Sequence, residues 1–331
     1  MATETKICPL ILAAGLGTRM KSTKAKVLHE VLFKPMLLHV LDTVQALKLG
    51  HACVVVGHQR EKIAGLAAKY QAECVIQEEQ LGTGHAVLCA EQALSARCVT
   101  VLILSGDVPL IKADSLQAML KAHTENKPVL TVMTTKLDTP GNYGRIVRNN
   151  RGEFLEIVEE KDASDEQKKI NEINAGIYCA DTDFLFAALK KVDCNNKQGE
   201  LYLTDIVKIA IKAGLRVDIF AGAGGEELLG VNSKIELAAA NRYLQQHKNS
   251  KLIAAGVDLI DPESIFIQQE VSIGRDTVIY ANVKISGNTS IGSNCTIGHD
   301  VQLKDCQIGN NAIIGPFSHL ASARVQNNEI V

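Results

Sequence analysis

An apolar residue recurs at every sixth position in the C-terminal part of the chain, a period that the rest of the sequence lacks. This spacing indicates short parallel strands wound into successive coils, with an apolar ladder that points inward. We therefore predict a left-handed parallel β-helix of hexapeptide repeats over 263–331. The exposed edges at its ends favour stacking or oligomerisation. The ladder consists of Ile267, Ile273, Ile279, Ile285, Ile291, Ile297 and Leu303 and, after a one-residue slip, Ile308, Ile314 and Leu320.

The N-terminal part begins with an apolar run over 7–14, typical of a strand buried on both faces of a parallel sheet. Gly15 and Gly17 follow it and allow the backbone to turn tightly and approach a ligand. Successive N–H groups in such a loop can bind an anion, and Arg19 and Lys26 add positive charge. The spacing matches neither the dinucleotide-binding motif nor the Walker A motif. From the residues alone, a phosphate site and an ordinary strand-to-helix turn both remain open.

Strand and helix patterns then alternate, with helices over 36–48 and 60–69 and strands over 52–56 and 74–76. This alternation indicates a parallel α/β sheet, which binds ligands at the carboxyl ends of its strands. A further apolar strand leads to Asp107. A carboxylate in that position is well placed for Mg²⁺, which takes oxygen ligands and substrate phosphates. The alternative, that Asp107 caps the next helix, is less favoured because better capping residues follow it.

Composition limits the classes of function. The 331 residues suffice for about two domains, and a formal net charge of −2 gives no bulk field that favours nucleic acid or a membrane surface. No apolar run reaches the length of a membrane span, residues 1–6 are polar, and tryptophan is absent. The nine cysteines lack metal-binding spacing, and we interpret them as reduced, buried thiols. We therefore expect a cytoplasmic protein with no nucleic-acid partner and no stable membrane insertion.

The glycine loop also carries a family resemblance. The stretch LAAGLGTRM over 12–20, with KVLH over 26–29, resembles the signature of sugar-1-phosphate nucleotidylyltransferases. More closely, it resembles the uridylyltransferase part of the bacterial bifunctional enzymes that join N-acetylglucosamine-1-phosphate uridylyltransferase to glucosamine-1-phosphate acetyltransferase. These enzymes usually have proline where this chain has Ala25. Because proline fixes φ, we expect a slightly looser loop here, with no loss of a reactive group.

The resemblance covers nearly the whole chain and implies a Rossmann-like nucleotide-diphospho-sugar transferase domain. It implies UTP and N-acetylglucosamine 1-phosphate as substrates, UDP-N-acetylglucosamine and pyrophosphate as products, and Mg²⁺ as cofactor. Arg19 and Lys26 would be catalytic, and Asp107 and Asn232 would bind the metal. The nucleotide-binding residues would be Leu12, Ala13, Ala14, Gly15, Gly17, Thr18, Gln77, Gly82 and Thr83, and the sugar-binding residues Gly144, Glu159, Asn174 and Asn232.

Several of these roles rest on the resemblance alone. The residues around Gln77 and the charge cluster around Glu159 would otherwise indicate ordinary loops. A histidine at a helix start, such as His85, is more often structural than a general base, and phosphoryl transfer needs little base catalysis. The motif QGE-x-Y-x-TD matches weaker candidates for the site wall, which are Glu200, Tyr202 and Thr204.

We expect a transferase domain over 1–232, a helical arm and linker over 233–262, and the β-helix over 263–331. In the resembling family these β-helices associate as trimers, which implies a homotrimer. The family's longer β-helix carries the acetyltransferase site. His319 and Arg324 alone do not constitute such a site, so we do not expect acetyl transfer from this chain.

Three other functions remain open from the sequence. The nearest is a nucleotidylyltransferase for another base or sugar 1-phosphate. The hexapeptide repeat also suggests an acyltransferase, which acetyl-CoA turnover would support. A non-catalytic β-helix assembly is the third, and the combination of Arg19, Lys26, Asp107 and Asn232 argues against it.

Overall fold

The computed structural model describes residues 6–222 and 224–331, so the polar segment 1–5 lies outside the described residues. The chain divides into two compact units. The first holds residues up to 29 and 36–233, and the second holds 30–35 and 234–331. Two stretches are grouped differently from the sequence-based boundaries: 30–35 and the helical arm both belong with the β-helix. Within the described residues, no helix is both long and apolar enough to cross a membrane.

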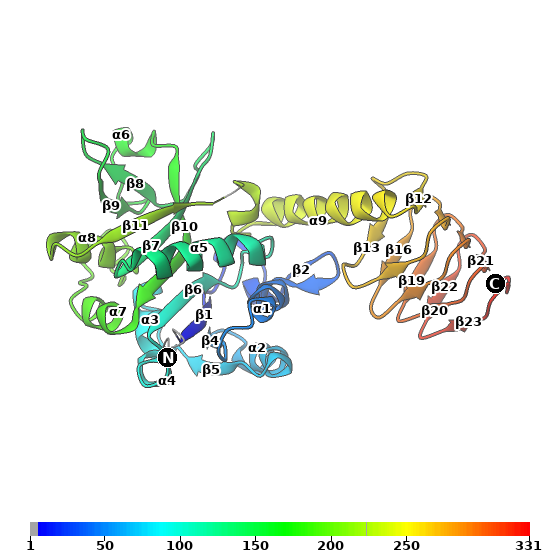
Figure 1. The fold of residues 1–331 in the computed structure, drawn as a ribbon, viewed down its shortest axis with the longest axis horizontal. Helices are drawn as coiled ribbons and strands as arrows, with labels where there is room; N and C mark the ends of the chain where they lie inside the picture. Colours follow the sequence, from blue (N-terminus) through cyan, green and yellow to red (C-terminus); the bar gives the residue numbers. More distant parts are fainter. Residues whose placement is uncertain (1–5, 223) are drawn as a thin grey trace. The chain divides into compact units, whose positions relative to one another are not determined.

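The first unit is built from alternating strands and helices (Figure 1). Its elements are β1 (Ile7–Ala13), η1 (Thr18–Met20), η2 (Lys26–Leu28), α1 (Met36–Ala46), β4 (Cys53–Val56), α2 (Arg60–Ala67), η3 (Ala68–Tyr70), β5 (Glu73–Ile76), α3 (Thr83–Cys89), α4 (Glu91–Leu94), β6 (Thr100–Ser105), α5 (Ala113–Asn126), β7 (Leu130–Lys136), β8 (Arg145–Arg148), β9 (Phe154–Val158), α6 (Asp165–Lys168), β10 (Glu172–Asp181), α7 (Thr182–Leu189), α8 (Asp205–Lys212), β11 (Val217–Ala221) and η4 (Glu226–Leu228).

The strands of this unit form one sheet in the order β11-β7-β10-β6-β1-β4-β5, and the β8–β9 hairpin extends from β10. Strand β1 pairs in parallel with β4 and β6, as the alternating pattern predicts. The predicted parallel alternation holds for β1, β4, β5 and β6, whereas β10 runs antiparallel to both β6 and β7. Strand β10 follows the antiparallel β8–β9 hairpin and the short helix α6, and it also pairs with β8.

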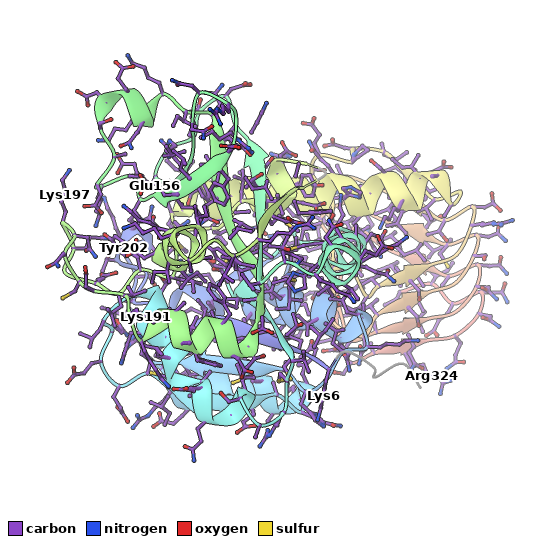
Figure 2. The ribbon with its side chains drawn as sticks, turned by 60° about the vertical axis from the view of Figure 1, so that its left-hand side comes forward. Lys6, Glu156, Lys191, Lys197, Tyr202 and Arg324 are labelled. Carbon is purple, nitrogen blue, oxygen red and sulfur yellow. A yellow bond between two sulfur atoms is a disulfide. The ribbon has the colours of Figure 1, made fainter. Side chains whose placement is uncertain are left out.

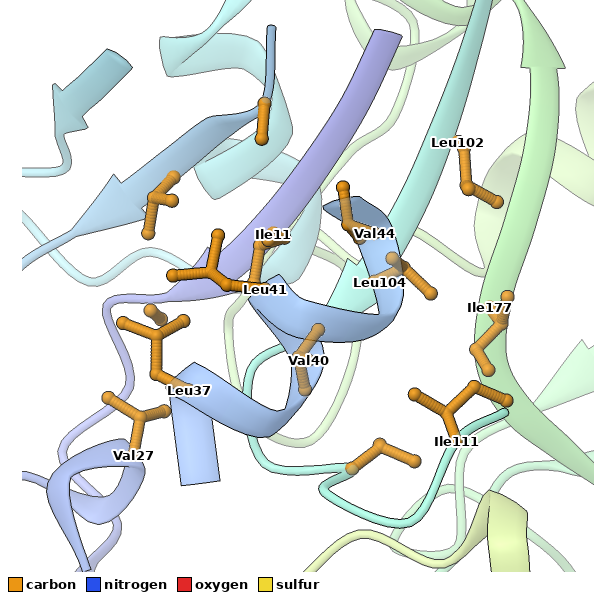
Figure 3. Packing of buried hydrophobic residues seen from close by; sticks show 14 of the residues in the cluster. Ile11, Val27, Leu37, Val40, Leu41, Val44, Leu102, Leu104, Ile111 and Ile177 are labelled. Atoms are coloured by element: carbon orange, nitrogen blue, oxygen red, sulfur yellow. The ribbon is translucent and has the colours of Figure 1, made fainter. Parts of the chain in front are cut away.

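Helices cover both faces of this sheet, because successive residues of a buried strand point to opposite sides. Ile11 packs with α1, α2 and α5, whereas Leu10 packs with α3, α4, α7 and α8. Figure 3 shows the first of these cores, in which α1 places Leu37, Val40 and Leu41 against the sheet. The two cores fix the sheet edge at which β1 and β6 end.

The second unit contains a hairpin, a long helix and three four-stranded sheets. Its elements are β2 (Glu30–Val31), β3 (Lys34–Pro35), α9 (Lys234–Ala254), β12 (Asp258–Leu259), β13 (Phe266–Ile267), β14 (Ser272–Ile273), β15 (Val278–Ile279), β16 (Lys284–Ser286), β17 (Ser290–Ile291), β18 (Thr296–Ile297), β19 (Gln302–Lys304), β20 (Gln307–Ile308), β21 (Ile313–Ile314), β22 (His319–Ala321) and β23 (Arg324–Val325).

The three sheets are the faces of the predicted left-handed parallel β-helix. Each sheet has four parallel strands, in the orders β12-β15-β18-β21, β13-β16-β19-β22 and β14-β17-β20-β23. The ladder residues pair with one another from coil to coil, as Ile267 with Ile285 and Ile285 with Leu303. All ten are buried or partly buried in one core. The one-residue slip falls in the corner after β19, so it shortens a turn without disturbing the ladder.

Polar side chains of α9 terminate the first coil of the β-helix. N–H groups of each coil donate to carbonyls of the next coil, as Phe266 N does to Val283 O. The corresponding carbonyls of the first coil therefore lack N–H donors, because no coil precedes it. Gln245 Nε2 donates to Glu263 O at 2.7 Å and to Ile265 O at 2.9 Å. Lys248 Nζ donates to two further carbonyls of this coil, and burial lowers its pKa.

Replacing Gln245 with leucine is therefore expected to reduce the free energy of unfolding by about 1–3 kcal/mol, because buried carbonyls lose their donor. Urea unfolding would measure the change. Gln246→Leu is the matched control, since Gln246 is exposed on the same helix and should change stability by less than about 0.5 kcal/mol. Equal stability of the two variants would contradict the capping role of Gln245.

The cysteines differ from the sequence-based interpretation. Cys8 and Cys98 form a disulfide, because the pairing of β1 with β6 brings the two chain segments together with a Cα separation of 5.8 Å. The other seven are free, and among them Cys194 is exposed. The prediction of reduced thiols is thus wrong for Cys8 and Cys98, and the prediction of burial is wrong for exposed Cys194 and half-buried Cys74 and Cys89. Both predictions hold for Cys53, where burial raises the thiol pKa to about 12.

Candidate active site

A cavity of about 440 Å³ lies at the carboxyl ends of β1 and β6. Its wall comes from the glycine loop, the end of β5, the start of α3 and the end of β6, as expected for an open α/β sheet. All nine residues predicted to bind the nucleotide line it, together with Lys26, Asp107 and Glu200. The fold therefore brings together segments that are far apart in the sequence.

The glycine loop approaches Lys26 closely. Gly17 has φ +64°, and a Cβ there would lie 2.6 Å from Lys26 Cβ, so the loop has no room for a side chain at this position. A Cβ on Gly15, by contrast, would meet no atom within 4 Å. The loop thus packs against the lysine on one side and faces open space on the other.

Lys26 connects the two predicted metal ligands. Its Nζ donates to Asp107 Oδ2 and, at 3.0 Å, to Asn232 Oδ1. Arg19 Nη2 also donates to Asn232 Oδ1 at 3.0 Å. Arg19 and Asn232 do not line the cavity, but these bonds join them to Lys26 and Asp107, which do. The four residues come from four segments of the chain and form one polar cluster.

The segment after β5 is held by its own hydrogen bonds. Gln77 Nε2 donates to Gly82 O at 3.2 Å and contacts His85 Nδ1 at 3.0 Å. This contact gives His85 a structural role in holding Gln77, as the sequence favours over a general base. Thr83 Oγ1 accepts from Leu203 N–H at 3.1 Å, which fastens this segment to the stretch before α8.

Gly82 allows no side chain. Its φ is +105°, and a Cβ would lie 2.6 Å from Leu201 O. We expect Gly82→Ala to lower kcat/KM for the nucleotide roughly tenfold to a hundredfold, since the displaced loop would carry Gln77 with it. Steady-state kinetics would measure this loss. Gly214→Ala is the control: φ there is +69° with no atom within 4 Å, so it imposes the backbone strain without the collision and should retain kcat/KM.

Three of the four residues predicted to bind the sugar lie together around β8, β9 and β10, whereas Asn232 lies in the polar cluster with Lys26. A Cβ on Gly144 would lie 3.5 Å from Glu159 Oε2 and 3.7 Å from Asn174 Cβ. Thr204 Oγ1 donates to Glu159 Oε1 at 3.1 Å, and burial raises the pKa of the Glu159 carboxyl. Asn174 already has internal partners, because its Nδ2 donates to Tyr178 OH at 2.6 Å and its Oδ1 accepts from Gly176 N–H at 3.0 Å.

A larger cavity of about 610 Å³ lies beside β9 and α8. Figure 2 labels three of its lining residues, Glu156, Lys191 and Tyr202. Of the residues predicted to bind substrate or metal it contains Glu159 alone, with Tyr202 from the weaker candidates, and the glycine loop does not contribute to its wall. Gly144 and Asn174 line neither cavity. The smaller cavity is therefore the one at which the residues predicted to bind phosphate and metal gather, either on its wall or through hydrogen bonds to Lys26 and Asn232.

Comparisons with known proteins agree with this arrangement. The MobA-like NTP transferase domain matches residues 9–173, and the bacterial transferase hexapeptide (six repeats) matches 270–305 and 288–322. The bifunctional protein GlmU of Desulfotalea psychrophila is 45% identical over 329 residues, which cover 99% of this chain and 97% of that protein. This chain belongs to the GlmU family. The GlmU of Geotalea daltonii is 44% identical, over 98% of this chain and 75% of its own length.

Membership in the GlmU family makes the chain a nucleotidyltransferase, of the UDP-N-acetylglucosamine pyrophosphorylase type. Solved structures support the fold of its first unit. A protein described as a glucose-1-phosphate thymidylyltransferase of Bacillus anthracis aligns with a TM-score of 0.58 at 20% identity, over 71% of this chain and 94% of that chain. A UDP-glucose pyrophosphorylase aligns with the same score and identity, over 73% of this chain and 99% of its own. At this identity the likeness shows the fold alone.

Two residues of this GlmU-family site were missed from the sequence. Tyr143 OH accepts from Gly230 N–H at 2.8 Å, which ties the segment before β8 to the one that carries Asn232. Gln80 Nε2 donates to Ala14 O at 2.9 Å and so fixes the end of β1. Neither gives a signal in the sequence, because a tyrosine beside a glycine and a glutamine in a polar loop are both common.

The oxygens of Asp107 and Asn232 fit a magnesium ion. Both accept from the same Lys26 Nζ, so both oxygens are directed at one cation, the lysine ammonium. No group of three or more His, Cys, Asp or Glu side chains that could hold a metal occurs among residues 6–222 and 224–331. Mg²⁺ is usually held by one or two protein oxygens and completes its shell with waters and substrate phosphates.

Proposed function

We propose that this chain transfers a uridylyl group from UTP to N-acetyl-α-D-glucosamine 1-phosphate, giving UDP-N-acetylglucosamine and pyrophosphate. The observation that carries the proposal is the polar cluster at the glycine-loop cavity, in which Lys26 bridges Asp107 and Asn232. Family membership supports the reaction type. The side chains around the site support the choice of base and sugar.

The side chain of Gln77 supports selection of uracil. Both of its amide hydrogens are used within the protein, on Gly82 O and His85 Nδ1, so Oε1 is the atom left for a base. An acceptor at this point suits the N3–H of uracil, whereas N3 of cytosine carries no hydrogen. A glutamine side chain can in general offer a base both a donor and an acceptor. We assign Gln77 the acceptor role, with Gly82 and Thr83 shaping the wall.

The sugar would lie between Gly144, Glu159 and Asn174. Glu159 Oε1 is held by Thr204, and the carboxylate can accept from sugar hydroxyls. Asn174 is oriented by Tyr178 and Gly176, and each of its polar atoms keeps capacity for one more hydrogen bond. The absence of a side chain at Gly144 leaves room beside both residues.

In the proposed reaction an oxygen of the sugar phosphate attacks the α-phosphorus of UTP in line. The bond from the α-phosphorus to the bridging oxygen breaks, and pyrophosphate leaves with the electron pair. Arg19 and Lys26 hold the triphosphate and stabilise the leaving charge, and N–H groups of residues 15–18 donate to phosphate oxygens. Catalysis is mostly positioning and charge neutralisation. Mg²⁺, held by Asp107 and Asn232, would supply further neutralisation of the phosphates.

A substrate panel tests this proposal. UTP, dTTP, CTP and GTP are each paired with N-acetylglucosamine 1-phosphate and glucose 1-phosphate, and acetyl-CoA is paired with glucosamine 1-phosphate. We expect the highest kcat/KM for UTP with N-acetylglucosamine 1-phosphate and no acetyl transfer. A preference for another base or sugar would overturn the substrate assignment, and acetyl-CoA turnover would favour the acyltransferase alternative.

Assembly and location are further proposals. We infer a homotrimer formed through the β-helix, as the resemblance implies, and light scattering of the purified chain would measure its mass. We place the reaction in the cytoplasm, where UTP is made. The inference of a trimer is independent of the chemistry proposed above, whereas the location rests on UTP as the substrate.

A further inference from the structure

The segment that leads to Lys26 has few contacts of its own. Residues 21–24 are exposed, between buried Met20 and buried Ala25. Lys21 is in the left-handed region at φ 47°, and Lys24 N–H donates within the segment, to Ser22 Oγ. The position of Lys26 therefore depends on what fixes the end of this exposed stretch.

Gln59 fixes that end from a neighbouring strand. It lies in the loop after β4, and its amide bonds to two points of the segment. Gln59 Oε1 accepts from Ala25 N–H at 3.1 Å, and Gln59 Nε2 donates to Thr23 O at 3.0 Å. The ring Nε2 of His58 also contacts Thr23 O at 3.1 Å. Ala25, whose N–H is held in this way, is the residue directly before Lys26.

The backbone of Gln59 indicates a specific role for this contact. Its φ of 57° lies in the left-handed region, which costs a non-glycine residue about 1 kcal/mol or more. Gln59 stands at the N-cap of α2, yet its side chain does not cap that helix. The side chain is instead directed at the segment 23–25. Ala25 has φ −54°, within the range that a proline ring would impose, and its N–H, which a proline would lack, is the group that Gln59 holds.

We propose that Gln59 is a positioning residue for Lys26. By binding Thr23 O and Ala25 N–H, it holds the lysine where its ammonium reaches Asp107, Asn232 and the phosphates of the nucleotide. The inference rests on the proposed function, since it assigns Lys26 a role in binding and transferring the triphosphate. It assigns Gln59 itself no contact with substrate.

A double-mutant cycle of Gln59→Met and Lys26→Met tests this role. Methionine keeps the length of the glutamine side chain and removes both hydrogen bonds. We expect Gln59→Met to lower kcat roughly tenfold to a hundredfold, with little change in KM for the sugar phosphate. In the Lys26→Met background the same substitution should cost less than about twofold, because the residue it positions is already gone. Gln71→Met is the matched control, at an exposed glutamine whose φ of 55° is close to that of Gln59.

The same cycle is measured on the dissociation constant of UTP by calorimetry, which needs no turnover. Weaker UTP binding in Gln59→Met, and no further weakening in the Lys26→Met background, would support the inference even if the acceptor sugar were assigned wrongly. An unchanged kcat in Gln59→Met would overturn it. Equal losses in the two backgrounds would also overturn it, since they would mean that Gln59 does not act through Lys26. Failure of the wild-type chain to turn over the proposed substrates would count against the proposed function alone.

Discussion

Replacing Asp107 with alanine is expected to lower uridylyl transfer by roughly 10³-fold or more, because several kcal/mol of charge stabilisation by a bound metal would be lost. Asp107 is buried, and its Oδ2 is one of the two side-chain oxygens that accept a hydrogen bond from Lys26 Nζ. The fold should survive, since the main-chain carbonyl of Asp107 still accepts from Val231 N–H at 2.8 Å.

Turnover at saturating Mg²⁺ would measure this effect, with circular dichroism to check the fold. Asp114→Ala is the matched control, because it removes an exposed carboxylate from the first turn of α5 and should leave the rate unchanged. A folded Asp107 variant that turns over at the wild-type rate would show that the metal lies elsewhere.

Arg19→Ala should lower kcat by roughly 10²–10³-fold, as expected when one preorganised charge contact to the transition state is removed. The guanidinium of Arg19 is exposed and donates to Asn232 Oδ1, so its loss should cost little stability. Lys21→Ala serves as the control, since it removes a nearby exposed cation. Comparable kcat values for the two variants would remove Arg19 from the mechanism.

The coils of the β-helix could be predicted from the sequence, because the apolar residue at every sixth position marks both where a short strand lies and which of its side chains points inward. With a period of six, ladder residues of successive coils should lie directly above one another. The pairing of Ile285 with Ile267 and with Leu303 confirms this. The capping of the first coil could not be predicted. Gln245 and Lys248 look like ordinary polar residues of a solvated helix until the carbonyls that they satisfy are in place.

The first unit was predictable where local pattern decides the structure and not where long-range pairing does. Apolar runs indicated β1, β4 and β6, but nothing in the run of β10 reveals that it pairs antiparallel. The disulfide between Cys8 and Cys98 likewise depends on strand pairing that brings together two cysteines separated by 90 residues in the sequence. The hairpin of residues 30–35 belongs to the second unit through contacts with α9, such as Leu32 N–H to Asn241 Oδ1.

The candidate site shows the same division. The glycine loop and Asp107 could be inferred from strands that end in small or charged residues, and the resemblance supplied Gln77 and Asn232. The bonds that hold them could not be inferred, because each joins residues distant in sequence: Tyr143 with Gly230, and Gln59 with Ala25. The partners of Asn174 show that a buried amide in a strand can be satisfied within the protein, so its burial alone does not indicate a ligand.

Pyrophosphate release from UTP tests the central claim most directly. It would be measured with and without N-acetylglucosamine 1-phosphate, at fixed Mg²⁺ and again after chelation with EDTA. We predict release that requires both substrates and stops when the chelator is added. Release from UTP alone, release that continues after chelation, or no release with this pair would contradict the proposed reaction.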